Sequence, residues 1–216
     1  MAVKICGVEA KSIAQKHGIC AGETLIAING HEINDILDFR FYETNTTLTL
    51  LLEGIGGTQR EITLRKAQYA SLGLEFETYL MDQQRRCRNN CVFCFIDQMR
   101  PGLRKSLYVK DDDWRLSLMM GNFVTLTNVD DQELDRIIRR HASPLYVSVH
   151  ATDPALRCRM MNNRFAGDIL QRLTRLKDAG IRFHCQIVVC PGWNDGEQLL
   201  RTLSDLRALA PAAQTA

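Results

Sequence analysis

The sequence lacks both a long apolar run and an excess of charge of one sign. No apolar run approaches the roughly 18 residues of a membrane span, and no basic stretch followed by an apolar segment opens the chain as an export signal would. The 27 Lys and Arg residues nearly balance the 25 Asp and Glu residues, so the formal charge is +2. A dedicated nucleic-acid or membrane-surface binder would need a basic face. The sequence therefore indicates neither a nucleic acid nor a membrane surface as a partner. No membrane segment is expected, and we expect a cytoplasmic protein.

Internal repeats and low-complexity tracts are also missing, whereas cysteine is abundant. The 216 residues include eight Cys, and 45% are hydrophobic and 24% charged, which is the mix of an ordinary globular protein. Because nothing indicates export, thiols or metal ligands are more expected than a disulfide framework. The length suggests one or two domains.

The chain changes character about a third of the way along. Residues 1–78 show short β-prone runs and glycine turns, including a hairpin signal over 46–66 centred on Gly54-Ile55-Gly56-Gly57. Residues 79–216 alternate predicted strands and helices, which favours an α/β fold with a parallel sheet covered by helices. The strands are predicted at 123–127, 145–149 and 183–189, and helices at 114–120, after Asp130, from Pro154, up to Gly180 and from Asp195.

A run of three cysteines carries the most specific chemistry. Residues 86–95, Arg-Cys-Arg-Asn-Asn-Cys-Val-Phe-Cys-Phe, contain the spacing Cys-x3-Cys-x2-Cys. The thiolates of Cys87, Cys91 and Cys94 can hold three corners of a 4Fe-4S cluster and leave the fourth iron open to a substrate. A zinc site is the alternative, but it would favour Cys pairs at two separate places, and the nearest His, His141, falls at the end of a predicted helix.

This motif resembles the signature of the radical S-adenosylmethionine (radical SAM) superfamily. The resemblance implies a 4Fe-4S cluster, S-adenosyl-L-methionine (SAM) as the second cofactor, and a partial (β/α)6 barrel with its chemistry at the carboxyl ends of the strands. His150 is a candidate SAM or substrate contact, although it could instead satisfy a backbone carbonyl at the rim. The full set of candidate SAM-binding residues is Phe93, Thr127, Asn128, Ser148, His150 and Val189.

The N-terminal segment resembles a bacterial PDZ domain. Residues 17–30 follow that family's Gly-x-x-x-Gly-Asp-x-Ile-x-x-x-Asn-Gly run, with Glu23 and Leu25 in place of the usual Asp and Ile. PDZ domains hold the terminal carboxylate of an extended peptide on the backbone N–H groups of a short loop. Here the candidate loop is Leu72-Gly73-Leu74 at the end of the domain. This would make the domain circularly permuted, with a peptide C-terminus as partner, unless the run is only a bend.

The whole chain resembles the DUF512-containing Fe–S oxidoreductases, bacterial fusions of a PDZ-like domain with a radical SAM domain. The cysteine run and residues 102–115 carry the likeness beside the PDZ-like segment. It implies an enzyme that reductively cleaves SAM to a 5′-deoxyadenosyl radical, which takes hydrogen from an unknown substrate, with a flavodoxin- or ferredoxin-like reductant. The alternative is a peptide-binding protein whose cluster serves electron transfer or structure. The fourth ligand that such a cluster would normally have is missing from the motif.

The barrel is expected to be incomplete in this sequence. A helix that returns along a parallel sheet should feed another parallel strand. The last predicted helix stops at Pro211, and residues 212–216 look too short to supply that strand. We therefore expect three or four parallel strands in a radical SAM core truncated at its C-terminal end.

Overall fold

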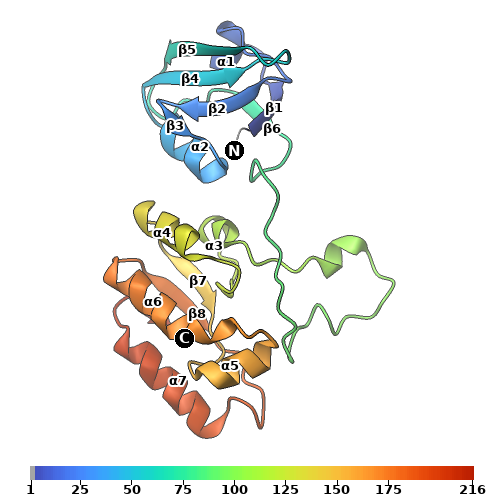
Figure 1. Cartoon of the computed structure of the whole chain (residues 1–216), viewed down its shortest axis with the longest axis vertical. Helices are drawn as coiled ribbons and strands as arrows, with labels where there is room; N and C mark the ends of the chain where they lie inside the picture. Colours follow the sequence, from blue (N-terminus) through green and yellow to red (C-terminus); the bar gives the residue numbers. More distant parts are fainter. Residues whose placement is uncertain (1–2) are drawn as a thin grey trace. The chain divides into compact units, whose positions relative to one another are not determined.

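The computed structural model describes residues 3–216, which divide into one compact unit ending at Gln84 and a second beginning at Arg85 (Figure 1). The fold is mixed α/β, with an antiparallel sheet in the first unit and a parallel sheet in the second. None of the helices in the described range combines the length and the hydropathy that a membrane crossing requires.

The N-terminal unit is built on an antiparallel sheet with the strand order β5-β4-β2-β1-β6 and with β3 paired to β2. The predicted hairpin is confirmed as β4 and β5, which pair from Thr47↔Arg65 to Glu53↔Gln59. The elements are β1 (Val3–Val8), α1 (Ile13–Lys16), β2 (Thr24–Ile28), β3 (His31–Glu32), α2 (Ile36–Glu43), β4 (Thr47–Glu53), β5 (Gln59–Arg65) and β6 (Leu74–Phe76).

Strand β6 lies at the edge of this sheet and pairs antiparallel with β1, from Ile5↔Phe76 to Val8↔Leu74. Gly73 precedes it with φ +76°, and a Cβ at this position would lie 2.3 Å from the Cβ of Ser12. Only glycine fits both the left-handed backbone and this close approach. The pairing with β1 is the one that a permuted arrangement requires, so residues 74–76 belong to the sheet and are not a detached bend.

The C-terminal unit is built on a parallel sheet of strand order β7-β8-β9 among helices, as the alternation of predicted strands and helices indicated (Figure 1). Its elements are η1 (Lys105–Tyr108), α3 (Trp114–Met120), α4 (Asp131–Arg139), β7 (Leu145–Ser148), α5 (Pro154–Met161), η2 (Ala166–Asp168), α6 (Ile169–Asp178), β8 (Phe183–Gln186), α7 (Gly196–Ala208) and β9 (Ala213–Thr215).

The predicted strand at 123–127 is wrong in extent, because only a single parallel bridge, Val124↔Val147, forms there. The N–H of Thr125 donates to the carboxylate of Asp112 at 2.6 Å, and the N–H of Thr127 donates to the hydroxyl of Thr125 at 3.2 Å. Neither of these N–H groups faces β7, because Val124 itself donates to Tyr146 and the next ladder donor would be the N–H of Leu126. Leu126 has a left-handed φ of +60°, and the carbonyl of Ser148, the acceptor it would need, accepts from Nη2 of Arg157 at 2.9 Å, so the ladder ends. The strand predicted at 183–189 likewise ends early, at Gln186.

The expectation that residues 212–216 are too short for another strand is also wrong. Residues Ala213–Thr215 form β9, which pairs in parallel with β8 through Phe183↔Ala213 and His184↔Thr215. A tight turn makes this possible, since the N–H of Ala212 donates to the carbonyl of Leu209 at 3.0 Å directly after α7. With the bridge at Val124, the parallel strands match the expected three or four.

The helix signals read from the sequence are confirmed. The carboxylate of Asp130 accepts the N–H of Glu133 at 2.8 Å, and Pro154 is the first residue of α5. Gly180, with φ +76°, follows the end of α6. The carboxylate of Glu133 accepts from the indole N–H of Trp114 at 2.8 Å. The side chain of Glu133 thus makes a tertiary contact. In a capping box it would instead bond back to the backbone N–H of the N-cap residue, Asp130.

Candidate metal and cofactor site

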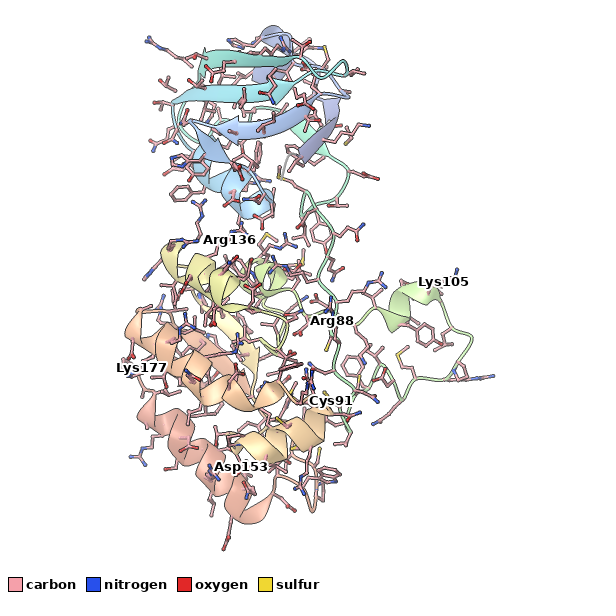
Figure 2. All side chains as sticks on the ribbon, in the orientation of Figure 1. Arg88, Cys91, Lys105, Arg136, Asp153 and Lys177 are labelled. Carbon is pink, nitrogen blue, oxygen red and sulfur yellow. The ribbon has the colours of Figure 1, made fainter. Side chains whose placement is uncertain are left out.

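The cysteine loop, in which Figure 2 labels Arg88 and Cys91, is fixed to the end of helix α5 by hydrogen bonds of its own backbone. The N–H of Asn90 donates to the carbonyl of Met161 at 3.1 Å, and the N–H of Val92 donates to that of Met160 at 2.9 Å. The last carbonyls of a helix have no partner within it. Because the loop supplies the missing donors, α5 positions the segment that carries Cys91.

The three thiols of the loop are half-buried and lie close enough to act on one another electrostatically. Burial, followed by the charges of Cys87 and Cys94, raises the pKa of the Cys91 thiol to about 12. Burial and the charge of Asp112 likewise raise the pKa of Cys87. A metal that binds the deprotonated thiolates would have to overcome these shifts.

The described residues do not form a finished site for a single metal ion. In residues 3–216 no three His, Cys, Asp or Glu side chains converge closely enough to hold one ion. A tetrahedral zinc site needs such convergence, whereas each thiolate of an iron–sulfur cluster binds a separate iron. The cysteine loop is therefore a candidate position for a cluster only, and its sulfurs do not converge on the position of one common ion.

Lys110 supplies positive charge beside the loop. Its ammonium group donates to the backbone carbonyl of Asn89 and to the carboxylate of Asp97, both at 2.7 Å. Lys110, followed by the neighbouring Cys94 thiol, holds the pKa of Asp97 below its ordinary value. The charge of Lys110 acts to lower the pKa of Cys87 and of Cys91, so it favours their thiolate forms.

Asn89, inside the cysteine motif, is a buried connector. Its Nδ2 lies 3.3 Å from the sulfur of Cys87, 3.1 Å from the hydroxyl of Thr125 and 2.9 Å from the hydroxyl of Thr127. Its Oδ1 accepts from the amide of Asn163 at 2.6 Å. With an exposure of 2%, this side chain links the cysteine loop to the segment after α3 and to the residues that follow α5.

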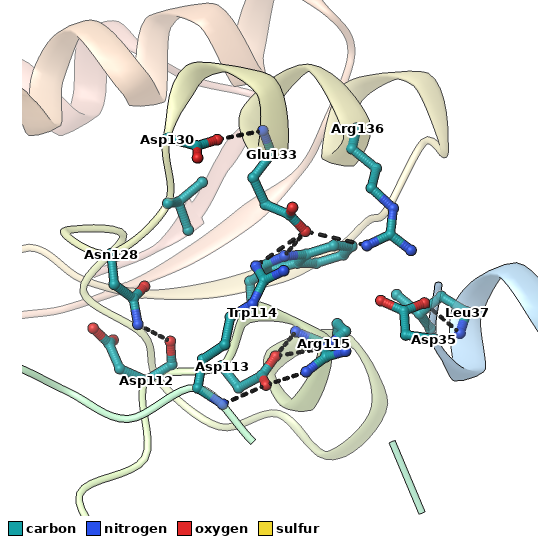
Figure 3. Close-up of polar contacts among 12 residues, drawn as sticks. Asp35, Leu37, Asp112, Asp113, Trp114, Arg115, Asn128, Asp130, Glu133 and Arg136 are labelled. Carbon is teal, nitrogen blue, oxygen red and sulfur yellow. Dashed lines mark hydrogen bonds and ion pairs between the residues drawn. The ribbon is translucent and has the colours of Figure 1, made fainter. Parts of the chain in front are cut away.

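Asn128 presents a buried acceptor that has no partner among the described residues. Its Nδ2 donates to the backbone carbonyl of Asp112 at 2.9 Å, whereas its Oδ1 is buried and accepts nothing (Figure 3). The Asp112 carboxyl group beside it accepts from the N–H and the hydroxyl of Thr125, and burial raises its pKa to about 6. A buried unpaired oxygen is costly, so this position suits the donor of a bound ligand.

His150 is neutral and carries its proton on Nε2. The backbone N–H of Val188 donates to Nδ1 at 3.2 Å, which requires that nitrogen to be unprotonated. Burial, and then the charge of Arg157, lowers the pKa of His150 to about 3. The ring of Phe93, from the cysteine loop, has its centroid 4.4 Å from that of His150.

The structure brings some of the predicted SAM-binding residues together with the cysteine loop. Phe93 contacts His150, and Thr127 reaches the loop through Asn89. The hydroxyl of Ser148 donates to the side chain of Gln186 at 3.2 Å. Val189 is 48% exposed.

Sequence reasoning missed the polar residues that surround the loop. Asp112 lies in an acidic run that reads as a helix cap, and Asp113 does cap α3. Lys110 and Arg157 look like surface cations in the sequence. For Asn89 the sequence offered one signal, namely the two adjacent Asn residues that lie between cysteines of the motif.

In the candidate carboxylate loop of the N-terminal unit, backbone N–H groups already donate hydrogen bonds to side chains of the protein itself. The N–H of Leu72 donates to the carboxylate of Glu43 at 2.8 Å, and the N–H of Gly73 donates to the hydroxyl of Ser71 at 3.1 Å. Glu43 is the last residue of α2 and is 7% exposed. One turn earlier in that helix, the ring of Phe39 meets the ring of Phe76 edge to face, with their centroids 5.1 Å apart.

Comparisons with known proteins give a family match and several structural matches. Residues 66–216 match the family model described as a radical SAM-like domain. Among solved structures, the chain is similar to the PDZ domain of an SdrC-like protein from Listeria innocua, with 17% sequence identity and a TM-score of 0.32, over 38% of this chain and 100% of that one. No curated protein matches the sequence.

Proposed function

The chain belongs to the radical SAM-like domain family, and on this premise we propose that it is a radical SAM enzyme of the DUF512-containing kind whose parallel sheet is part of a (β/α)6 barrel. A bound 4Fe-4S cluster and SAM would supply an electron and a 5′-deoxyadenosyl radical able to take hydrogen from a substrate. The observation that carries the proposal is the placement of three mutually interacting thiols on one loop held by α5.

The protein's own residues would bind the cluster, orient its ligands and offset its negative charge. Cys87, Cys91 and Cys94 are the thiolate ligands. The amide of Asn89, 3.3 Å from the sulfur of Cys87, orients that ligand, since hydrogen bonds to cluster sulfurs are one means of tuning the cluster. Lys110 offsets the negative charge that the thiolates bring into a half-buried loop.

The SAM site would be formed by the residues that follow the strand segments. The buried Oδ1 of Asn128, which accepts no hydrogen bond from the described residues, would accept from the ammonium group of SAM. The Nε2–H of His150 would donate to a ligand oxygen, and Phe93 would lie beside the adenine. Thr127, Ser148 and Val189 complete the proposed lining.

The test of this function is SAM binding to anaerobically reconstituted protein. Addition of SAM should change the electron paramagnetic resonance spectrum of the reduced cluster, because SAM binds the open iron. A purely electron-transferring cluster, the alternative function, would give the same spectrum with and without SAM. Production of methionine and 5′-deoxyadenosine with dithionite as reductant would then follow.

Asn128→Leu should weaken SAM binding about 10- to 100-fold, since a hydrogen bond to a charged group contributes about 1.5–3 kcal/mol. The measurement is the dissociation constant of SAM from protein with a full iron content. Asn45→Ala, an exposed position in the N-terminal unit, is the matched control and should leave that constant unchanged. An unaltered constant for Asn128→Leu would remove Asn128 from the site.

For the N-terminal unit we propose a peptide C-terminus as ligand of Leu72-Gly73-Leu74, entering only when Glu43 gives up the N–H of Leu72. Glu43→Gln keeps an acceptor but removes the competing charge, so it should tighten binding about fivefold, the difference between a charged and a neutral hydrogen bond. A hexapeptide with a free, apolar C-terminus is the probe, and Glu61→Gln, exposed on β5, is the control. Equal binding of the free-acid and amidated peptides would exclude carboxylate recognition.

A further inference from the structure

Arg157 is a fully buried cation that none of the proposed steps uses. It lies in α5 and is 1% exposed. Its guanidinium group donates to four backbone carbonyls: from Nε to Val149 at 2.9 Å, from Nη1 to Ala166 at 2.5 Å, and from Nη2 to Ser148 at 2.9 Å and Thr125 at 3.0 Å. Within residues 3–216 no carboxylate forms a hydrogen bond or ion pair with it.

A buried positive charge of this kind needs negatively charged groups nearby to balance it. Removing an ion from water is unfavourable, and protein dipoles alone offset only part of that penalty. The carboxylates whose charges act on Arg157 are those of Asp168 and Asp112, and the Cys91 thiol acts on it in the same way when it is deprotonated as a ligand. Asp168 already pairs with Arg172 at 2.6 Å, and burial raises the pKa of Asp112 to about 6, so that its charge is easily lost.

Helix α5 carries Arg157 and also holds the cysteine loop. The carbonyls that it binds belong to the end of β7, to the segment after the bridge at Val124, and to η2. One helical turn farther along α5, the carbonyls of Met160 and Met161 hold the loop that carries Cys91. The same helix therefore fixes both the strand ends and the thiols relative to this cation.

We propose that Arg157 is a positioning residue and the buried counter-charge of the cluster held by Cys87, Cys91 and Cys94. This inference rests on the proposed function. The guanidinium group fixes the strand ends against α5, and its charge is balanced by the anionic thiolates and cluster. Reduction adds an electron to that centre, so a permanent positive charge in a medium of low dielectric constant favours the reduced state.

The test is the midpoint potential of the reconstituted cluster, followed by electron paramagnetic resonance during a redox titration. Arg157→Met should shift the potential to a more negative value, whereas Arg157→Lys, which keeps the charge, should stay close to the wild type. Arg159→Met is the matched control, because Arg159 lies in the same helix with its side chain exposed, and its potential should not change.

The outcomes separate this inference from the proposed function. If the wild type binds no iron–sulfur cluster, the proposed function fails. If the wild type and Arg157→Met hold equal iron and have equal potentials, the proposed function stands and Arg157 is only a structural clamp. If Arg157→Met does not retain iron, Arg157→Gln is measured in its place, because Gln is neutral but keeps two hydrogen-bond donors. A midpoint potential of Arg157→Gln equal to that of the wild type would then overturn the inference.

Discussion

Replacing Cys87, Cys91 or Cys94 by Ala is expected to abolish the iron content of anaerobically purified protein. The wild type should be brown and contain about four iron atoms per chain, because the three thiols are the only ligands that the loop offers to a 4Fe-4S cluster. With the fourth iron already lacking a protein ligand, loss of one more thiolate leaves too few anchors. Iron analysis and the visible absorption spectrum measure the effect.

Cys158→Ala is the control for these variants. Cys158 is also half-buried, and its thiol lies 3.5 Å from the carbonyl of Arg164, outside the cysteine loop. This variant should keep the full iron content and the brown colour. Stoichiometric zinc in the wild-type protein, or iron retained at the wild-type level by Cys91→Ala, would contradict the assignment of the site.

Arg115→Met is expected to destabilise the C-terminal unit by about 3–5 kcal/mol, the usual effect of breaking a buried ion pair. The side chains of Arg115 and Asp113 are both 0% exposed, and they join through Nη2 and Oδ2 at 2.6 Å (Figure 3). The same carboxylate accepts the N–H of Arg85 at 3.0 Å. Removal of the guanidinium group therefore leaves a buried charge with only backbone donors.

Urea unfolding followed by tryptophan fluorescence measures this loss, because both tryptophans, Trp114 and Trp193, lie in the C-terminal unit. Arg175→Met is the control. Arg175 pairs with the exposed Asp131 at 2.6 Å, and such surface pairs contribute less than about 1 kcal/mol. Equal free energies of unfolding for the two variants would show that the buried pair has no special role.

The pH dependence of unfolding should distinguish the same variant. Burial raises the pKa of Asp113, but the hydrogen bonds and charge of Arg115 and the N–H of Arg85 outweigh it and hold that pKa below its ordinary value. In the wild type this carboxylate thus stabilises the unit above the pKa of the unfolded chain, and the contribution is lost as pH falls through the folded pKa. In Arg115→Met burial dominates, so the contribution of Asp113 should instead improve as pH falls.

Local patterns were sufficient for much of the chain. The hairpin of β4 and β5 follows from a glycine-rich turn between two β-prone runs, and the starts of α4 and α5 follow from Asp130 and Pro154. These features depend on residues within a few positions of one another. The cysteine motif is of the same kind, because Cys87, Cys91 and Cys94 lie on one short segment of the sequence.

Long-range side-chain contacts decided what the sequence could not show. The segment at 123–127 stops after one bridge because Leu126 has a left-handed φ of +60° and the carbonyl of Ser148 accepts from Arg157 instead. Strand β9 forms because Leu209 starts a turn that returns three residues to β8. Neither event has a signal within the segment itself.

The surroundings of the cysteine loop depended most on the tertiary structure. The sequence by itself identified the thiols and the family they resemble. It could not show that Arg157 binds four carbonyls from three other segments, nor that the oxygen of Asn128 stays unpaired. Hydrogen-bond partners and burial are properties of the packed chain, and an arginine or asparagine has the same letter whether it lies in water or beside a buried strand end.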